Sequence, residues 1–223
     1  EKMYLFIIEG IDGSGKATQL SLLKTKLENA GKTVMPISFP NYADRSSGPV
    51  KMYLEGELGK DPSDVSAYAA SSLFAIDRFA SYKKTWEKPY KDGTVIISDR
   101  YVLSNIIHQA SKLADGEKKA FVEWLYDLEY NKLGIPKPTA SFFLDVPPEV
   151  SMKNIEKRYS GDESKKDIHE KNRQYMNDCY KTAKEILPLL GVKAVECTKN
   201  GEMKPADEIS DIIFGEVEKI LGE

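Results

Sequence analysis

The chain has 223 residues, of which 41% are hydrophobic and 30% charged, and its formal net charge is −3 at pH 7. This balance is typical of a globular protein with a substantial core, and it gives no reason to expect a nucleic-acid partner. No apolar run approaches the roughly 20 residues of a membrane span, and two cysteines fit neither a disulfide framework nor a zinc site. We expect a cytoplasmic protein without a signal peptide or membrane partner, folded as one domain over residues 1–223.

The chain alternates predicted strands with predicted helices. Residues 4–8 form a nearly continuous apolar run, which is typical of a strand covered on both faces. Pro36 favours a sheet edge for the second strand, because proline cannot donate to a ladder. The alternation predicts an α/β fold with about five parallel strands and helices on both faces. The predicted strands are 4–8, 34–38, 94–98, 140–146 and 192–197. The predicted helices with both ends assigned are 65–86, 102–113, 117–132 and 205–221. Of the others, one begins at Lys16, one begins at Pro147 and one ends at Leu190.

Between the first strand and the first helix lies Gly10-Ile-Asp-Gly-Ser-Gly-Lys16, which fits the phosphate-binding pattern G-x-x-x-x-G-K. Glycines allow successive backbone N–H groups to surround phosphate oxygens, and the helix N-terminus adds partial positive charge. Lys16 supplies a full positive charge for the β- and γ-phosphates. The alternative is a glycine-rich turn with a surface lysine. The predicted ATP-binding residues are Gly10, Asp12, Gly13, Ser14, Gly15, Lys16, Ala17 and Thr18.

One position departs from this pattern. Ala17 stands where serine or threonine usually follows the lysine and contacts Mg²⁺. We expect Mg²⁺ to be held by water and carboxylates instead, since this ion commonly keeps several waters. The alternative is a degenerate loop in a catalytically inactive protein.

A protein that passes a phosphoryl group from a nucleotide on this loop to a second phosphate must hold two polyanions end to end, so it needs positive groups directed at both. Lys16 serves the donor. Arg78 and Arg100 are then the candidates for the acceptor monophosphate, because a planar guanidinium pairs bidentately with phosphate. The alternative for Arg78 is a salt bridge on its own helix, but no carboxylate lies three or four positions away. Asp99 and Arg100 follow a buried strand, where ligands bind in open α/β sheets, although a structural strand cap is the alternative.

Several short motifs, each weak alone, occur together in a specific order. They are Asp12 inside the phosphate loop, Phe39-Pro40, Phe74-Ala-Ile-Asp-Arg78, Asp99-Arg100-Tyr101, Leu133-Gly-Ile-Pro-Lys-Pro138 and Asp167-Ile-His-Glu170. From residue 4 to about residue 200 the chain resembles the thymidylate kinases. The resemblance implies a P-loop three-layer sandwich with a short mobile lid, and ATP-dependent phosphorylation of dTMP to dTDP. It also implies Mg²⁺ as cofactor, a homodimer and a cis peptide bond before Pro40.

The resemblance assigns further roles. Phe74 corresponds to the aromatic that stacks on thymine, although an aromatic on a helix is more often part of the core. His108 stands where some relatives carry a tyrosine near the deoxyribose. The implied metal-site residues, partly through water, are Asp12, Asp99 and Glu170. The implied dTMP-binding residues are Asp12, Phe39, Tyr42, Phe74, Arg78, Arg100, Asn105 and His108.

A polar and highly charged segment is expected to act as the lid, over approximately residues 158–167. Composition alone favours a solvated surface loop. Phosphoryl transfer, however, requires exclusion of water, and in this family a closing lid brings a cation onto the transferring group. Arg158 is the first candidate, with Lys165 or Lys166 in reserve. The predicted catalytic residues are Asp12, Lys16, Arg100 and Arg158.

Two other functions compete with this prediction. The first is a kinase of the same fold that acts on another nucleoside monophosphate or on a deoxynucleoside. The second is a nucleotide-binding switch, against which stands the lack of an Asn-Lys-x-Asp guanine-reading motif, since Thr198-Lys-Asn-Gly201 does not match it. An assay over several acceptors distinguishes the first alternative.

Overall fold

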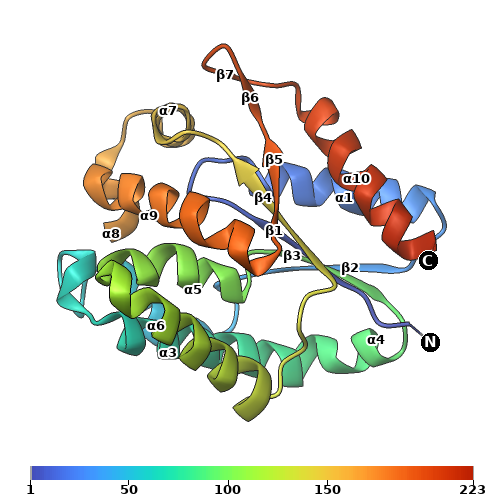
Figure 1. Cartoon of the computed structure of the whole chain (residues 1–223), viewed down its shortest axis with the longest axis horizontal. Helices are drawn as coiled ribbons and strands as arrows, with labels where there is room; N and C mark the ends of the chain where they lie inside the picture. The colour runs from blue at the N-terminus through green and yellow to red at the C-terminus, as the bar shows by residue number, and fades with distance from the viewer. Residues whose placement is uncertain (1, 223) are drawn as a thin grey trace.

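The computed structural model describes residues 2–222 and contains a central sheet of five parallel strands. The strand order is β2-β3-β1-β4-β5, so the first strand lies in the middle (Figure 1). In register, Leu5 faces Ile96 on β3, and Phe6 faces Ala140 on β4. The strands of this sheet are β1 (Leu5–Glu9), β2 (Val34–Ser38), β3 (Val95–Asp99), β4 (Ala140–Asp145) and β5 (Lys193–Glu196).

Helices connect successive strands and cover both faces of the sheet. Two of them end in π-helical turns, η3 (Tyr82–Trp86) after α3 and η5 (Asp127–Lys132) after α6. Short 3-10 turns, among them η6 (Glu163–Lys165), lie in the connections. The α-helices are α1 (Lys16–Asn29), α2 (Gly48–Leu54), α3 (Ala67–Ser81), α4 (Glu87–Lys91), α5 (Val102–Gln109), α6 (Asp115–Tyr126), α7 (Pro148–Tyr159), α8 (Ile168–Lys171), α9 (Arg173–Ile186) and α10 (Ala206–Gly222).

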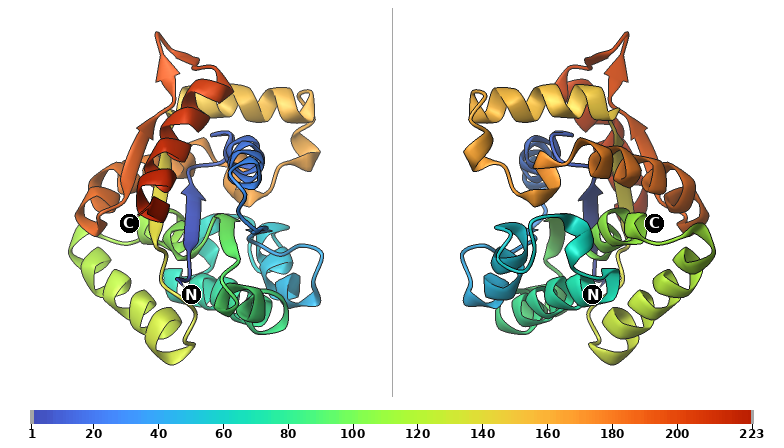
Figure 2. Two further views of the ribbon diagram at one scale, coloured as in Figure 1. Left: turned by 90° about the vertical axis from the view of Figure 1, so that its right-hand side faces the viewer. Right: turned by 90° about the vertical axis from the view of Figure 1, so that its left-hand side faces the viewer.

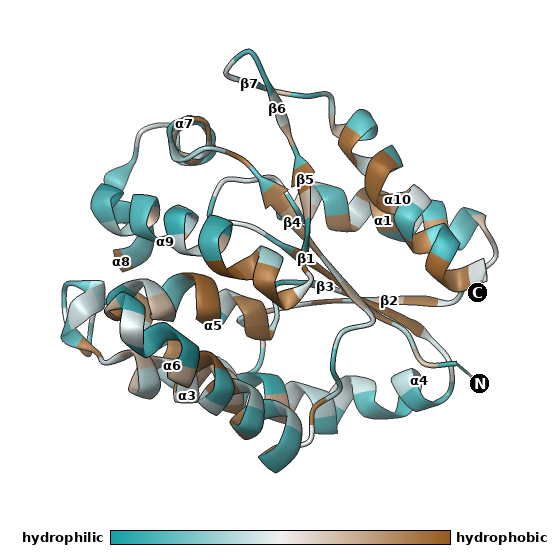
Figure 3. Cartoon of the chain, viewed as in Figure 1, coloured by the Kyte–Doolittle hydropathy of each residue, from teal (hydrophilic) through white to brown (hydrophobic). Residues whose placement is uncertain are grey.

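The alternation of side chains along β1 divides the core into two layers. Leu5 and Ile7 pack with side chains of α5, α6 and α9 on one face. Phe6 and Ile8 pack with α1 and α10 on the other. Because every residue of β1 is buried, this strand has no polar face, in agreement with its continuous apolar sequence. Figure 3 shows the hydrophobic residues concentrated on the strands and on the helix faces turned toward them. The predicted three-layer α/β architecture is confirmed.

Several elements were not predicted, among them the short helix α4, which directly follows the predicted helix 65–86. Helix α2 lies in a segment that the sequence pattern left unassigned, and a small antiparallel hairpin follows β5. Its strands are β6 (Thr198–Lys199) and β7 (Glu202–Met203), joined by Asn200 and Gly201 with φ of 54° and 78°. Asn-Gly is a strong two-residue hairpin signal, so the sequence did carry this information. Figure 2 shows the hairpin projecting beyond the sheet, on the side away from the N-terminus.

Other sequence expectations are met. Pro36 lies on β2, which is an edge strand. The peptide bond between Phe39 and Pro40 is cis, as the resemblance implied. The long helix predicted over 65–86 is observed as α3 continued by the π-helical turn η3. None of the helices within residues 2–222 combines the length and apolar character that a membrane crossing needs.

Candidate active site

A cleft of about 810 Å³ lies beyond the carboxyl ends of β1 and β3, where open α/β sheets bind their ligands. The phosphate loop, α3, α5 and the segment between α7 and α8 all contribute to its walls. Of the predicted site residues, Gly10 and Ser14 do not line the cleft. Those that do are Asp12, Gly13, Gly15, Lys16, Ala17, Thr18, Phe39, Tyr42, Phe74, Arg78, Asp99, Arg100, Asn105, His108, Arg158, Lys165, Lys166 and Glu170.

The phosphate loop is shaped by close backbone approaches. Gly13 has a φ of 80°, and a Cβ atom there would lie 2.3 Å from the backbone oxygen of Ser151 on α7. The Asn154 side chain of the same helix donates to the Gly13 carbonyl at 2.9 Å. Lys16 begins α1, and its buried ammonium group donates to the Ile11 carbonyl at 3.0 Å. The loop is therefore held from outside by α7 while its lysine lies along its inner side, as a phosphate cradle requires.

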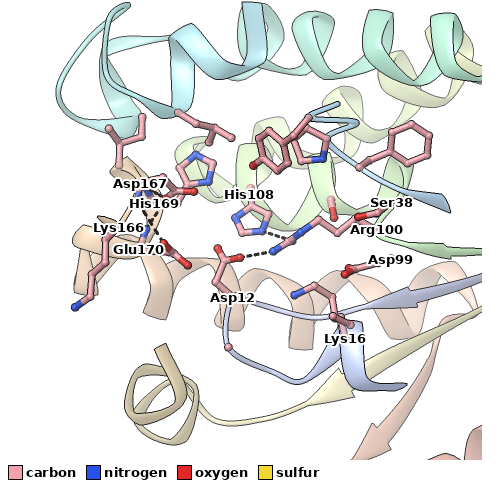
Figure 4. A pocket seen from close by; sticks show the side chains of 18 of the residues that line it. Asp12, Lys16, Ser38, Asp99, Arg100, His108, Lys166, Asp167, His169 and Glu170 are labelled. Carbon is pink, nitrogen blue, oxygen red and sulfur yellow. Dashed lines mark hydrogen bonds and ion pairs between the residues drawn. The ribbon is translucent and has the colours of Figure 1, made fainter. Parts of the chain in front are cut away.

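Asp12 and Arg100 form an ion pair at the centre of the cleft (Figure 4). Arg100 follows β3 with a φ of 68°, and its Nη1 also lies 3.2 Å from Nε2 of His108. Burial alone would raise the pKa of Asp12, but the positive charges of Arg100 and Lys16 hold it well below its usual range. Asp12 is thus a carboxylate close to both of the cations that the sequence assigned to two different phosphates.

The position of Arg100 depends on a residue that the sequence analysis missed. Glu9, the last residue of β1, is fully buried and accepts hydrogen bonds from the Tyr101 backbone N–H at 2.7 Å and from Ser104 Oγ at 2.8 Å. These bonds fix the start of α5 directly after Arg100. A carboxylate at the end of an otherwise apolar strand was the available signal.

Lys16 and Asp99 are two charged groups close to each other at the phosphate loop (Figure 4). Burial and the neighbouring Arg100 lower the pKa of Lys16 to about 8, although Asp99 and Asp12 counteract this shift. Asp99 also lines the cleft, and its Oδ1 is buried without a hydrogen-bond partner among the described residues. An orphaned carboxylate oxygen is a suitable direct or water-mediated ligand for Mg²⁺.

The residues assigned to the metal do not form a closed cage. Within the described chain, no group of three or more His, Cys, Asp or Glu side chains is arranged to hold an ion. Glu170 faces Asp12 from the lid side, where it accepts hydrogen bonds from Tyr159 Oη at 3.2 Å and from the Asp167 N–H at 3.3 Å (Figure 4). The donor set therefore fits an ion that takes most of its ligands from water and phosphate oxygens, as Mg²⁺ does.

Arg78 has a buried partner that the sequence analysis did not identify. Its Nε and Nη2 donate to the two carboxylate oxygens of Glu129 on η5, at 2.7 and 2.5 Å. Both side chains are essentially inaccessible, with exposures of 1% and 0%. The Asn105 amide nitrogen donates to the same carboxylate at 3.4 Å and to the Ser71 carbonyl at 3.2 Å. Because Glu129 is distant in sequence, no local pattern could have revealed this pair.

The aromatic residues assigned to the acceptor differ in their exposure. Phe74 is half-buried, lines the cleft, and packs edge-on against Tyr53 with ring centroids 6.1 Å apart. It thus belongs to the core on one side and to the cleft on the other. Phe39 is buried and packs on Tyr101, whereas Tyr42 is 53% exposed at the cleft mouth.

The only two histidines of the chain stack on one another at one end of the cleft. The rings of His108 and His169 are 5.1 Å apart with an interplanar angle of 9°. His169 Nε2 lies 2.8 Å from the Tyr53 hydroxyl. Burial lowers the pKa of both histidines, that of His169 to about 3, so both rings are neutral near neutral pH. Sequence analysis predicted His108 as a site residue and missed His169.

The predicted lid connects α7 to α8 and carries cations along the cleft. Arg158, in the last turn of α7, is half-exposed and lies 3.4 Å from the Glu170 carboxylate. Lys165 and Lys166 pair with Asp162 and Glu163 at 3.4 and 2.5 Å. All three cations line the cleft, but each is paired with a carboxylate, Arg158 with Glu170 on α8 and the two lysines with carboxylates of the lid. Each must exchange its partner before it can bind a phosphate.

Comparisons with known proteins agree with this geometry. A family model for thymidylate kinase matches residues 8–200. The chain is 32% identical over 221 residues to the probable thymidylate kinase of Thermococcus kodakarensis, covering 97% of this chain and 98% of that relative. It is 35% identical over 156 residues to the probable thymidylate kinase of Pyrobaculum aerophilum, covering 70% and 71%. A thymidylate kinase structure from Candida albicans shares the fold, with a TM-score of 0.71 and 22% identity over 98% of this chain and 92% of that one. The chain belongs to the thymidylate kinase family.

Proposed function

We propose that the protein transfers the γ-phosphoryl group of ATP to dTMP, giving dTDP and ADP. The observation that carries this proposal is that Lys16 and Arg100 both lie close to Asp12 in one cleft. Lys16 belongs to the phosphate loop, and Arg100 follows a different strand, so each can serve a different nucleotide. A kinase of nucleoside monophosphates needs such a pair of anion sites facing each other.

The catalytic contribution of the protein is positioning and neutralisation of charge. The loop amides and Lys16 hold the donor phosphates, and Arg100 holds the acceptor phosphate, whose attacking oxygen is already ionised and needs no strong base. Arg158 leaves Glu170 and stabilises the transferring group when the lid, residues 158–167, closes. Mg²⁺, held beside Asp12 and Asp99 largely through water, would supply further neutralisation of the phosphate charge.

Arg78 is better suited to the acceptor base than to its phosphate. Glu129 already neutralises the Arg78 guanidinium, and a neutralised cation attracts a dianion poorly. Phe74 lies one helical turn before Arg78 on α3, so both side chains face the same part of the cleft. We therefore assign the acceptor phosphate to Arg100, and the base to Arg78 and Asn105, with Phe74 stacking on the ring.

We also propose that the protein forms a cytoplasmic homodimer with one domain in each subunit. The support for the dimer is the exposed apolar surface of α3, where Tyr68 is 40% and Ile76 is 54% exposed. Helix α5, the other apolar helix, is almost entirely buried within the chain and leaves α3 as the available face. Sedimentation of the wild type and of Ile76→Glu tests this proposal, which requires the variant to dissociate to monomers.

A coupled assay for ADP release tests the reaction itself. The wild type is given ATP, Mg²⁺ and one acceptor from the set dTMP, dUMP, UMP, CMP, AMP, GMP and thymidine. We expect the highest kcat/KM with dTMP, and none of this activity in Lys16→Met. Preference for another acceptor would refute the assignment, and ATP binding without transfer to any acceptor would indicate an inactive member of the family.

A further inference from the structure

Glu129 does not line the cleft, yet it contacts two residues that do. It accepts hydrogen bonds from Nε and Nη2 of Arg78 and from the amide nitrogen of Asn105, and its side chain is fully buried. It lies on the π-helical turn η5, a local distortion of the kind often found at functional sites. We propose that Glu129 is a positioning residue that determines which pyrimidine the acceptor site takes, an inference that rests on the proposed function.

The carboxylate fixes the orientation of the Asn105 amide. The two groups that face the Asn105 nitrogen, the Ser71 carbonyl and the Glu129 carboxylate, are both acceptors. Only the NH₂ end of the amide can satisfy them, so its carbonyl oxygen must point the other way. Among residues 2–222 no donor bonds to this Oδ1, which leaves an acceptor available on the cleft side.

The same carboxylate determines which nitrogen of the Arg78 guanidinium remains available to a ligand. Its Nε and Nη2 are both directed at Glu129, so Nη1 is the one nitrogen of the guanidinium without a partner in the described chain. The wall of the cleft therefore offers a donor from Arg78 next to an acceptor from Asn105. Without Glu129 neither orientation is determined, because an amide can turn over and a guanidinium can rotate.

This pattern of donor and acceptor matches thymine and uracil and opposes cytosine. The C4 carbonyl of thymine accepts a hydrogen bond and its N3–H donates one, whereas cytosine donates from its C4 amino group and accepts at N3. Cytosine would thus set donor against donor and acceptor against acceptor. A site built to hydrogen-bond one edge discriminates strongly, because a mismatched base leaves buried polar groups unpaired.

The test compares three acceptors in wild type and Glu129→Gln, with kcat and KM measured separately. We expect the dTMP-to-dCMP ratio of kcat/KM to fall by at least about tenfold in the variant, mainly through KM. The ratio of dTMP to dUMP stays unchanged, because uracil presents the same edge, and the KM for ATP is also unaffected. Asp127→Asn, a change of equal charge at a half-exposed position of the same turn, should leave all these values as in wild type.

A purely structural role predicts a different result. If Glu129 only neutralises Arg78, Glu129→Gln lowers kcat/KM for dTMP and for dCMP by the same factor. An unchanged dTMP-to-dCMP ratio in a folded variant therefore overturns the inference. If Glu129→Gln does not fold, the double variant Arg78→Met with Glu129→Leu removes both buried charges together, a replacement that proteins often tolerate. There the preference for dTMP over dCMP should disappear, and its retention would also overturn the inference. Lack of dTMP turnover in the wild type would refute the proposed function as well.

Discussion

The carboxylate of Asp12 and the guanidinium of Arg100, 88 residues apart in sequence, are paired in the cleft. The guanidinium of Arg100 thus already has an anionic partner within the chain. When an acceptor phosphate binds, it competes with Asp12 for this cation, and the two anions then lie close together. We therefore expect Asp12 to oppose binding of the acceptor in the ground state, although it lies next to Arg100 and Lys16, the residues proposed to hold the two phosphates.

This competition predicts opposite effects of Asp12→Asn on binding and on turnover. The acceptor should bind more tightly, with its Kd lowered by about threefold, because a competing negative charge is gone. The value of kcat should fall by about 100-fold, because the carboxylate that helps to arrange Arg100, Lys16 and the metal is lost. Equilibrium titration with dTMP and initial rates measure the two quantities. Weaker dTMP binding in the variant would show that Asp12 attracts the acceptor instead of opposing it.

The lowered pKa of Lys16 predicts that binding of the donor nucleotide, ATP, depends on pH. Its pKa in the free protein is lowered to about 8 by burial and by Arg100, well below that of a free lysine. Bound phosphates raise this pKa again, so binding favours the protonated lysine. Above about pH 8 the free protein has lost this proton and must take it up on binding. We expect kcat/KM for ATP to be constant up to that pH and to decrease above it.

Lys16→Arg provides the control, because a guanidinium keeps its charge throughout this range. Whatever its absolute rate, this variant should show no decrease of kcat/KM for ATP from about pH 7 to about pH 9.5. Proton uptake on ATP binding, measured by calorimetry in two buffers, should likewise occur only in the wild type. A decrease shared by both proteins would place the titrating group elsewhere.

Local patterns in the sequence predicted the parts of the site that are built locally. The strand, loop and helix around Lys16 could be identified because all three are contiguous, and Arg100 followed from its place after a buried strand. The partners of these residues could not be identified. Glu129 meets Arg78, and His169 stacks on His108, only because the fold brings separate helices together. Such contacts depend on side-chain packing between distant segments, on which periodicity and motif spacing carry no information.

Ala17 allows a test of how Mg²⁺ is held. It is exposed, lines the cleft, and stands where a hydroxyl usually contacts the ion. Ala17→Ser restores that ligand, so the Mg²⁺ concentration that gives half the maximal rate should decrease by about threefold. Thr18→Ala, at the adjacent exposed position, should leave the requirement unchanged, because its hydroxyl points elsewhere on α1. An equal response in both variants would mean that the hydroxyl at position 17 does not reach the ion.

Arg158 provides the test of the lid. In this structure its only ionic partner among the described residues is Glu170, at 3.4 Å, and its side chain is 51% exposed. Such a pair contributes little to stability, so Arg158→Ala should keep the thermal unfolding temperature of the wild type. Its kcat should nevertheless fall by at least about 100-fold, because a cation on the transferring group acts mainly in the transition state.

The matched control for this prediction is Arg173→Ala, at the start of α9. That arginine is 76% exposed and, within residues 2–222, forms an ion pair only with Glu156, at 4.0 Å, so its loss removes the same charge without touching the cleft. Both variants should retain the wild-type KM for dTMP, and only Arg158→Ala should lose turnover. Normal turnover in Arg158→Ala would transfer the role to Lys165 or Lys166, which line the same cleft and can be replaced in turn. If none of the three replacements lowered kcat, the lid would serve only to exclude water, and stabilisation of the transferring group would rest with Lys16 and Arg100.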